Sequence, residues 1–315
     1  MCRHLAYLGP PVPLARLLTE TRHGLYEQSW APRRQRHGTV NADGFGVGWY
    51  PGGPDGAGGP DGAGGADGAG GPDGAGGHGA YPARYRRAVP IWADGNLPDL
   101  ARTIRSHAVL AAVRDATAGT TQDESAAAPY ADGPWLFSHN GSVPDWTRLA
   151  DEPALRPAPA DLLAMEARCD TALLWTLARS RLRSGQPAGR VLAELVLAVA
   201  AVRPPARLNL LLTDGRTVTA TRFGDTLWYR RSEGAVVVAS EPDAAEGWCE
   251  VPEDSLLVAT PAAVRTTPLA EARAASLTEP FSADPPVGPA PGRDAARAPE
   301  TAVAAPELFE RTRTP

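Results

Sequence analysis

The order of apolar segments along the chain constrains its fold more than any other feature. Short segments with strand-like alternation come first, and two longer segments with helical periodicity follow at 170–183 and 189–202. Strand-like segments return from residue 207 onward. This order predicts sheets that are covered by helices. The predicted strands are 2–8, 44–50, 83–89, 107–113, 135–138, 208–212, 217–221, 226–230, 236–239 and 256–259, with shorter helices expected within 12–21 and 96–105.

Two segments lack the apolar residues that a core requires. Residues 54–77 contain four copies of a six-residue unit, and residues 51–79 hold 15 of the 33 glycines. Such a sequence has high backbone entropy and little to bury, so we expect a disordered insertion in the hairpin between two strands. Residues 271–315 are rich in Pro and Ala and are expected to form a disordered tail. The remainder suits one domain, 2–270, or two small ones.

Charge and hydropathy argue against two classes of partner. The net charge is −5 and no basic stripe occurs, so nucleic acid is not an expected partner. The longest apolar run, 191–202, is interrupted by Glu194 and is too short to cross a membrane; no secretory signal is recognised.

Three cysteines, Cys2, Cys169 and Cys249, argue against a disulfide framework and fit the reducing cytoplasm. The sequence leaves the oligomeric state open.

Cys2 combines two reactive groups if Met1 is removed. Its thiol is then joined by a free α-amine, which titrates at about 7.7–8.0 and can accept a proton near neutral pH. A thiol attacks as the thiolate and needs such a base. One residue thus supplies both nucleophile and base. The alternative is that Cys2 is a small apolar residue at the start of a strand.

Arg114 and Asp170 are candidates for binding a ligand that carries both charges. Arg114 follows a predicted strand, and its guanidinium can hold a carboxylate through two parallel hydrogen bonds. Asp170 opens a predicted helix and can bind an ammonium group. The alternatives are a surface ion pair for Arg114 and a helix N-cap for Asp170.

Asn140 and Gly141 follow another predicted strand. An Asn amide and a backbone N–H are donors that stabilise an oxyanion, although Asn-Gly is also a frequent turn. The alternating glycines of 44–48 indicate close approach of either substrate or a neighbouring strand. The histidines are scattered without metal-ligand spacing, so neither a metal nor a cofactor is expected.

Together these motifs resemble the class II glutamine amidotransferase family of N-terminal nucleophile hydrolases. The similarity rests on the Met1-Cys2 start, the strand that ends in Arg114-Asp115-Ala116-Thr117, the His139-Asn140-Gly141 motif and Asp170-Thr171, and it covers about residues 2–240. The resemblance implies an α+β fold, a four-layer αββα sandwich of two antiparallel sheets. It implies Cys2 as the nucleophile with its own α-amine as base. It also implies that the Asn140 side chain and the Gly141 N–H form the oxyanion hole, with Arg114 and Asp170 holding the α-carboxylate and α-ammonium of a small-molecule γ-glutamyl substrate.

Further stretches narrow the resemblance. The opening 2–9, residues 28–35 with 41–46, and Ser240-Glu241-Pro242 are similar to the branch whose members hydrolyse γ-glutamyl-hercynylcysteine S-oxide in ergothioneine biosynthesis. The family's glutamine-using synthases carry a His where this chain has Ala118, and we expect no second synthase domain. Both departures favour an enzyme that hydrolyses a γ-glutamyl amide without passing ammonia to a synthase domain. The hydrolysis would proceed through a Cys2 thioester.

Two other functions remain open at this point. The chain can instead hydrolyse other γ-glutamyl peptides or glutathione conjugates, or bind γ-glutamyl ligands without catalysis. A trimethylammonium group in the substrate favours an aromatic wall, for which Trp30 and Tyr130 are candidates. Arg33 and Arg34 are candidates for contacting a second carboxylate.

Overall fold

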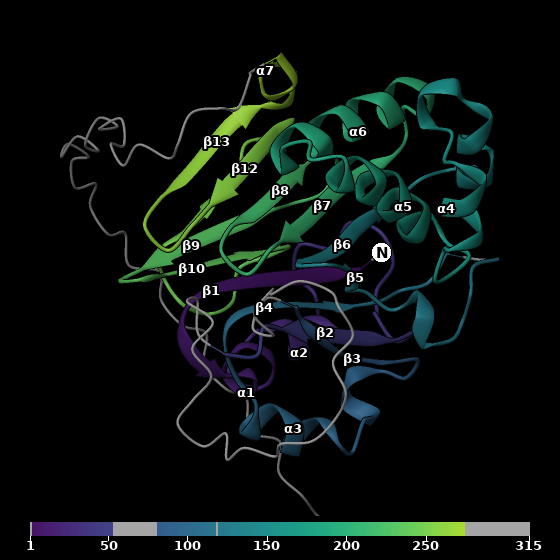
Figure 1. The fold of residues 1–315 in the computed structure, drawn as a ribbon. Coiled ribbons are helices and arrows are strands. Elements are labelled where there is room, and N and C mark those ends of the chain that lie inside the picture. Colours follow the sequence, from purple (N-terminus) through teal and green to yellow (C-terminus); the bar gives the residue numbers. More distant parts are fainter. Residues whose placement is uncertain (1, 53–80, 118, 275–315) are drawn as a thin grey trace, which may run out of the picture. The chain divides into compact units, whose positions relative to one another are not determined.

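Two antiparallel sheets form the centre of the fold (Figure 1). The structure is a computed structural model that describes residues 2–52, 81–117 and 119–274. Sheet A has the strand order β11 (Trp248–Glu250), β9 (Trp228–Ser232), β10 (Ala235–Ala239), β1 (Arg3–Pro13), β4 (Arg105–Val113), β2 (Phe45–Trp49), β3 (Ala83–Arg87). Sheet B has the order β13 (Val264–Pro268), β12 (Ser255–Ala259), β8 (Val218–Arg222), β7 (Arg207–Thr213), β6 (Trp135–Ser142), β5 (Tyr130–Asp132).

Helices cover the outer face of each sheet (Figure 1). Over sheet A lie α1 (Leu14–Leu18), α2 (Leu25–Gln28) and α3 (Leu97–Thr103). Over sheet B lie α5 (Asp170–Arg183) and α6 (Ala188–Val202). The remaining helical segments are η1 (Ile91–Ala93), η2 (Glu124–Ala126), η3 (Trp146–Asp151), η4 (Pro153–Leu155), α4 (Pro159–Leu163) and α7 (Leu269–Ala274). The four-layer αββα prediction is confirmed.

Strand β1 shows how one sequence pattern builds two of the three apolar layers. Leu5 and Tyr7 belong to the core between sheet A and its helices. Ala6 and Leu8 belong to the core between the two sheets. Because side chains alternate along a strand, Cys2 follows the parity of Ala6 and faces the second sheet. A third core joins sheet B to α5 and α6.

Most predicted elements are confirmed, and α5 has the predicted bounds. Several boundaries differ by one or two residues, and two were wrong by four or five. Strand β6 was expected to end at Ser138, but it runs to Ser142, so Asn140-Gly141 lies within a strand and is not a turn. Strand β1 was expected to end at residue 8, but it continues to Pro13.

The prolines of β1 are tolerated because only half of the strand has a neighbour on both sides. Residues Leu5 to Leu8 pair with both β10 and β4, whereas Val12 and Pro13 pair with β4 alone. The register shifts between Leu8 and Val12. Proline lacks the N–H that a central strand needs, so it is accommodated where one side of the strand is open.

The glycines of β2 make room for a neighbouring segment of the chain and not for substrate. A Cβ at Gly48 would lie 2.7 Å from Leu136 Cδ1 and 3.0 Å from Pro129 Cγ. Strand β2 pairs with β3, as expected of the strands on either side of the insertion. The insertion itself, Ala118 and nearly all of the expected tail lie outside the described residues.

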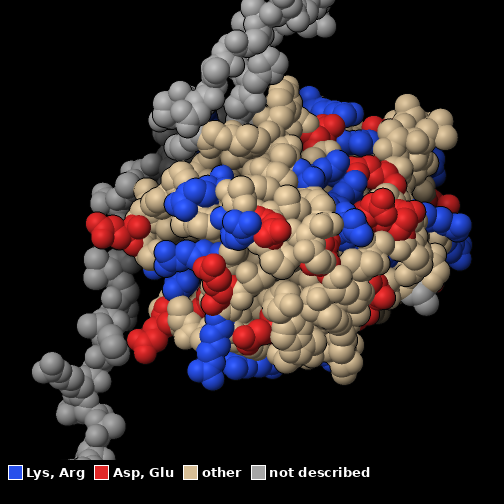
Figure 2. Space-filling model, turned by 90° about the horizontal axis from the view of Figure 1, so that it is seen from below, with Lys and Arg blue, Asp and Glu red and all other residues tan. Residues whose placement is uncertain are grey.

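On the face shown in Figure 2, acidic and basic side chains are interspersed. Within the described residues, no helix is both long and apolar enough to cross a membrane.

Candidate active site

Cys2 is placed by the pairing of β1 with β4. Arg3 lies opposite Val113, so Cys2 lies beside Arg114 at the end of β4. The Cys2 residue is half-buried. Burial raises the pKa of the thiol, and the negative charge of Asp170 raises it further by a smaller amount. Three groups lower the pKa of this thiol: the charge of the chain's amino terminus, the Asp115 backbone N–H and the charge of Arg114. The net pKa is raised, so the thiol keeps its proton at neutral pH and needs a base.

Arg114 is buried and anchored by neutral oxygens. Its guanidinium donates to Thr120 Oγ1 at 3.0 Å, to the Thr121 carbonyl at 2.7 Å and to the Asp43 carbonyl at 3.4 Å. Its backbone N–H donates to the Gly44 carbonyl at 2.8 Å. Among the described residues, no carboxylate forms an ion pair with Arg114. The alternative of a surface ion pair is therefore wrong, and the positive charge of Arg114 is buried without a charged partner among the described residues.

Asp170 provides the opposite charge in the same manner. Its Oδ2 accepts the Val143 N–H at 3.0 Å and its Oδ1 accepts the Thr171 N–H at 2.8 Å. The carboxylate is buried and, within the described part of the chain, it forms no ion pair. It is not the N-cap of α5: Cys169 is the N-cap, with its Sγ accepting the Ala172 N–H at 3.4 Å. Asp170 is thus held by backbone N–H groups, which leaves its charge available.

Asn140 and Gly141 lie on β6 of sheet B. Leu136 of β6 packs between the sheets and Phe137 packs toward the helices, so Asn140 shares the parity of Leu136 and faces sheet A. Gly141 has φ +155°, and a Cβ there would collide with the Arg207 carbonyl. The position therefore requires glycine.

Hydrogen bonds join these segments into one site. Asn140 Nδ2 lies 3.1 Å from Ser240 Oγ, and Ser240 Oγ accepts the His4 N–H at 3.0 Å. Thr121, which anchors Arg114, accepts the Arg168 N–H at 2.8 Å, two residues before Asp170. Both Arg114 and Asp170 act electrostatically on Cys2. The segments that carry Cys2, Arg114, Asn140 and Asp170 are therefore linked to one another.

Sequence reasoning missed the residues that support this site. Asp43 Oδ2 accepts the Ala116 N–H at 2.7 Å and so shapes the loop after β4. Thr120 and Ser240 also contact predicted residues. The similarity of residues 41–46 gave a signal for Asp43, and the Ser240-Glu241-Pro242 similarity gave one for Ser240.

The aromatic and basic residues that were candidates for contacting the leaving group make contacts within the protein. Tyr130 is fully buried and its hydroxyl lies 3.3 Å from Cys169 Sγ, so it is core and not an exposed wall. Trp30 is 41% exposed and packs edge to face against Tyr26 and Trp92. Glu241 Oε2 accepts the Arg34 N–H at 2.8 Å, and the Arg34 guanidinium lies over Trp228, 5.5 Å from the ring centroid.

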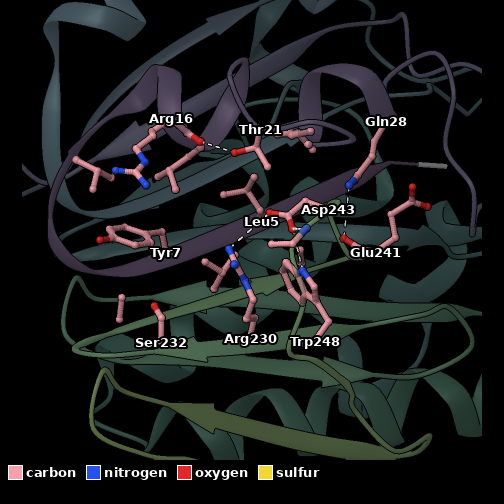
Figure 3. Close-up of a pocket in the computed structure, with 18 of the residues that line it drawn as sticks. Leu5, Tyr7, Arg16, Thr21, Gln28, Arg230, Ser232, Glu241, Asp243 and Trp248 are labelled. Atoms are coloured by element: carbon pink, nitrogen blue, oxygen red, sulfur yellow. Dashed lines mark hydrogen bonds and ion pairs between the residues drawn. The ribbon is translucent and has the colours of Figure 1, made fainter.

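The cavity in Figure 3 is separate from this site. It has a volume of about 540 Å³ and is lined by Leu5 and Tyr7, whose side chains face away from the second sheet. Cys2 has the opposite parity. The described residues contain no cluster of three or more side chains that suits a metal ion.

Comparison with known proteins gives consistent results. The sequence profile of class II glutamine amidotransferases matches residues 91–234. The chain is 38% identical over 274 residues to the γ-glutamyl-hercynylcysteine sulfoxide hydrolase of Mycobacterium tuberculosis, with 87% of this chain and 99% of that protein covered. It is 39% identical over 271 residues to the hydrolase of the same name from Mycolicibacterium smegmatis, with 85% and 100% covered.

Solved structures share the fold at low sequence identity. A glutamine aminotransferase class-II domain protein from Silicibacter pomeroyi superposes with a TM-score of 0.55 at 22% identity, covering 85% of this chain and 99% of that one. The glutamine phosphoribosylpyrophosphate amidotransferase of Bacillus subtilis also gives 0.55, at 13% identity, covering 85% and 49%. At these identities the similarity supports the fold alone.

Proposed function

The chain belongs to the γ-glutamyl-hercynylcysteine sulfoxide hydrolases, within the class II glutamine amidotransferases, and from this premise we propose how its site works. It is an amidohydrolase that cleaves the γ-glutamyl amide of γ-glutamyl-hercynylcysteine S-oxide, releasing glutamate and hercynylcysteine S-oxide in ergothioneine biosynthesis. The observation that carries the proposal is the convergence of one thiol with a buried cation and a buried anion, each held by uncharged groups.

The two charges match the head of a γ-glutamyl group. That head carries one α-carboxylate and one α-ammonium. Arg114 would bind the carboxylate, and Asp170 would bind the ammonium. The side chain of the glutamyl group would then extend toward Cys2, which places the γ-carbonyl at the thiol.

The reaction would proceed through a thioester. The α-amine of Cys2, freed by removal of Met1, takes the thiol proton, and the sulfur attacks the γ-carbonyl. The Asn140 side chain and the Gly141 N–H stabilise the oxyanion. The C–N bond breaks, the leaving amine takes the proton from the Cys2 ammonium, and an S-glutamyl enzyme remains. The α-amine then activates water, which releases glutamate and restores the thiol.

The test combines an intact-mass measurement of the purified chain with an assay of glutamate release. All 31 basic residues counted as Lys or Arg are arginines, so the chain's α-amine is its only aliphatic amine. A reagent selective for 1,2-aminothiols therefore reports removal of Met1 without interference. We expect loss of Met1, one label per chain and glutamate release from the S-oxide substrate, with Cys2→Ala folded but inactive.

Other outcomes would change the assignment. Release only from other γ-glutamyl peptides or glutathione conjugates would keep the chemistry and move the substrate. A retained Met1 with no release from any γ-glutamyl donor would leave a non-catalytic binding subunit. Substantial turnover by Cys2→Ala would remove Cys2 from the nucleophile role.

A further inference from the structure

Ser240 is fully buried and lies where the two sheets meet at the site. It follows β10 directly, and its backbone N–H donates to the His4 carbonyl at 3.0 Å. Its own carbonyl accepts from Thr226 Oγ1 at 2.7 Å. The backbone of Ser240 is therefore fixed on both sides, and its hydroxyl has little freedom to move.

The hydroxyl of Ser240 connects the nucleophile strand to the oxyanion donor. Its Oγ accepts the His4 N–H at 3.0 Å, two residues after Cys2. The same Oγ lies 3.1 Å from the amide nitrogen of Asn140. In this arrangement Ser240 receives two N–H donors, while Asn140 Oδ1 is buried and, among the described residues, has no hydrogen-bond partner.

Turning the Asn140 amide by 180° gives both Ser240 Oγ and Asn140 Oδ1 a complete set of partners and leaves only the Nδ2 hydrogens unpaired in the described structure. The nitrogen and oxygen of an amide have nearly the same size, so the turned group occupies the same space. Ser240 then accepts the His4 N–H and donates its own hydrogen to Asn140 Oδ1. The two Nδ2 hydrogens are left to point away from Ser240, on the side of Asn140 where the buried oxygen had no partner.

We propose that Ser240 is a positioning residue that holds the Asn140 amide with its nitrogen toward the reacting carbonyl. This inference rests on the proposed function of Asn140 as an oxyanion donor. Only the nitrogen of an amide can donate to an oxyanion, so an amide in the opposite orientation would repel the developing charge. One hydroxyl thus sets the orientation of the donor and ties it to the strand that carries the nucleophile.

Ser138 provides a matched control. It is also a fully buried serine, it lies on β6 two residues before Asn140, and its hydroxyl also contacts His4, through Nδ1 at 2.8 Å. No hydrogen bond joins its side chain to Asn140 within the described structure. Ser138→Ala therefore removes a comparable buried hydroxyl but leaves the orientation of Asn140 untouched.

The kinetic test compares Ser240→Ala with Ser138→Ala in the full chain. Loss of one oxyanion donor typically lowers kcat about 10²–10³-fold, and we expect about tenfold or more for a donor that remains but is misoriented. In Ser240→Ala, kcat should fall while KM stays within about twofold, and in Ser138→Ala both should stay within about twofold. An unchanged kcat in Ser240→Ala, a change confined to KM, or an equal fall in both variants would overturn the proposal.

A neutron structure of the deuterated wild-type enzyme tests the orientation without turnover. We expect the Ser240 deuteron on the line to Asn140 Oδ1 and both amide deuterons away from Ser240. An amide deuteron bonded toward Ser240 Oγ would overturn the proposal. If the wild type released no glutamate from any γ-glutamyl donor, the proposed function would fail, and the neutron structure would decide the role of Ser240 by itself.

Discussion

At the scale of single residues, the proposed function assigns the binding of charge and the chemistry to different side chains. Arg114 and Asp170 are each fixed by groups that leave their charges uncompensated. A buried ionised group without a partner is costly, so the free site favours any ligand that supplies both opposite charges. A γ-glutamyl head is such a ligand, because its two charges are on one carbon.

Acyl donors that lack either the carboxylate or the ammonium of the γ-glutamyl head should identify the separate roles of Arg114 and Asp170. Glutaryl amides keep the carboxylate and lack the ammonium, whereas 4-aminobutanoyl amides keep the ammonium and lack the carboxylate. Arg114→Met should lower kcat/KM for γ-glutamyl and glutaryl donors about 10–100-fold, since charge-assisted hydrogen bonds contribute about 1.5–3 kcal/mol. It should leave 4-aminobutanoyl donors nearly unchanged. Asp170→Asn should give the reciprocal pattern.

These effects are measured as steady-state kcat/KM for the three donors. Arg148→Met is the control, because Arg148 is exposed and pairs only with Asp151, three residues away, in the described structure. The assignment is wrong if either variant lowers kcat/KM equally for all three donors.

His4 should make folding sensitive to acid. Burial, with smaller effects from His139 and Arg3, lowers the pKa of His4 from 6.5 to about 3. The unfolded chain therefore binds a proton below about pH 6.5 that the folded chain refuses. The free energy of unfolding should fall as pH drops from about 6.5 toward 3, by up to about 1.4 kcal/mol per pH unit from this residue.

Urea unfolding at several pH values between 7.5 and 4.5 measures this dependence. His4→Gln cannot titrate, so its unfolding free energy should fall less steeply with acid than that of the wild type. Parallel slopes for the two proteins would contradict a neutral, buried His4.

At the scale of elements, close contact between the sheets depends on β2. Gly46 and Gly48 leave room for the segment 128–136, which leads into β6 and so to Asn140. The same sequence pattern fits a substrate loop and a strand under close contact, and only the partner segment distinguishes them. The fold therefore uses these glycines to set the spacing of the layers.

Filling this space should destabilise the protein. Gly48→Ala places a Cβ 2.7 Å from Leu136 Cδ1, and overpacking of this kind costs about 1–3 kcal/mol. Gly95→Ala is the control, because nothing lies within 4 Å of a Cβ at that position. Urea unfolding should show the loss for Gly48→Ala and a change within about 0.5 kcal/mol for Gly95→Ala. Similar values for the two variants would refute the tight contact.

The elements also show what sequence could and could not predict. The bounds of α5 follow from its helical periodicity, which is a local property. The continuation of β6 through Asn140-Gly141 was missed because this pair favours turns locally, whereas pairing with Asn209 and Leu208 keeps it extended. Ser240 contacts Asn140 across 100 residues of sequence. No local pattern encodes such a contact.

At the scale of the whole molecule, the described strands on either side of residues 53–80 pair directly with each other. Strands β2 and β3 pair from Phe45–Arg87 to Trp49–Ala83, so a short turn can join them. All of the site residues lie on other segments. We propose that the insertion 51–79 adds neither binding nor catalytic groups.

Replacing residues 54–79 with a short turn should leave kcat/KM within about twofold. If the segment is disordered as the sequence predicts, the free energy of unfolding should rise by about 1 kcal/mol, because each halving of the length of such a loop reduces its closure cost by about 0.6 kcal/mol. Glutamate release and urea unfolding measure the two quantities. A large loss of activity in a folded variant would show that the insertion serves the site.

The position of β1 at the centre of sheet A also has a consequence for biosynthesis. The strand pairs with β4 and with β10, which ends at Ala239 and so lies far along the chain. The strand cannot be enclosed until most of the chain has been translated. Under the proposed function, removal of Met1 can therefore precede completion of the sheet that later encloses Cys2.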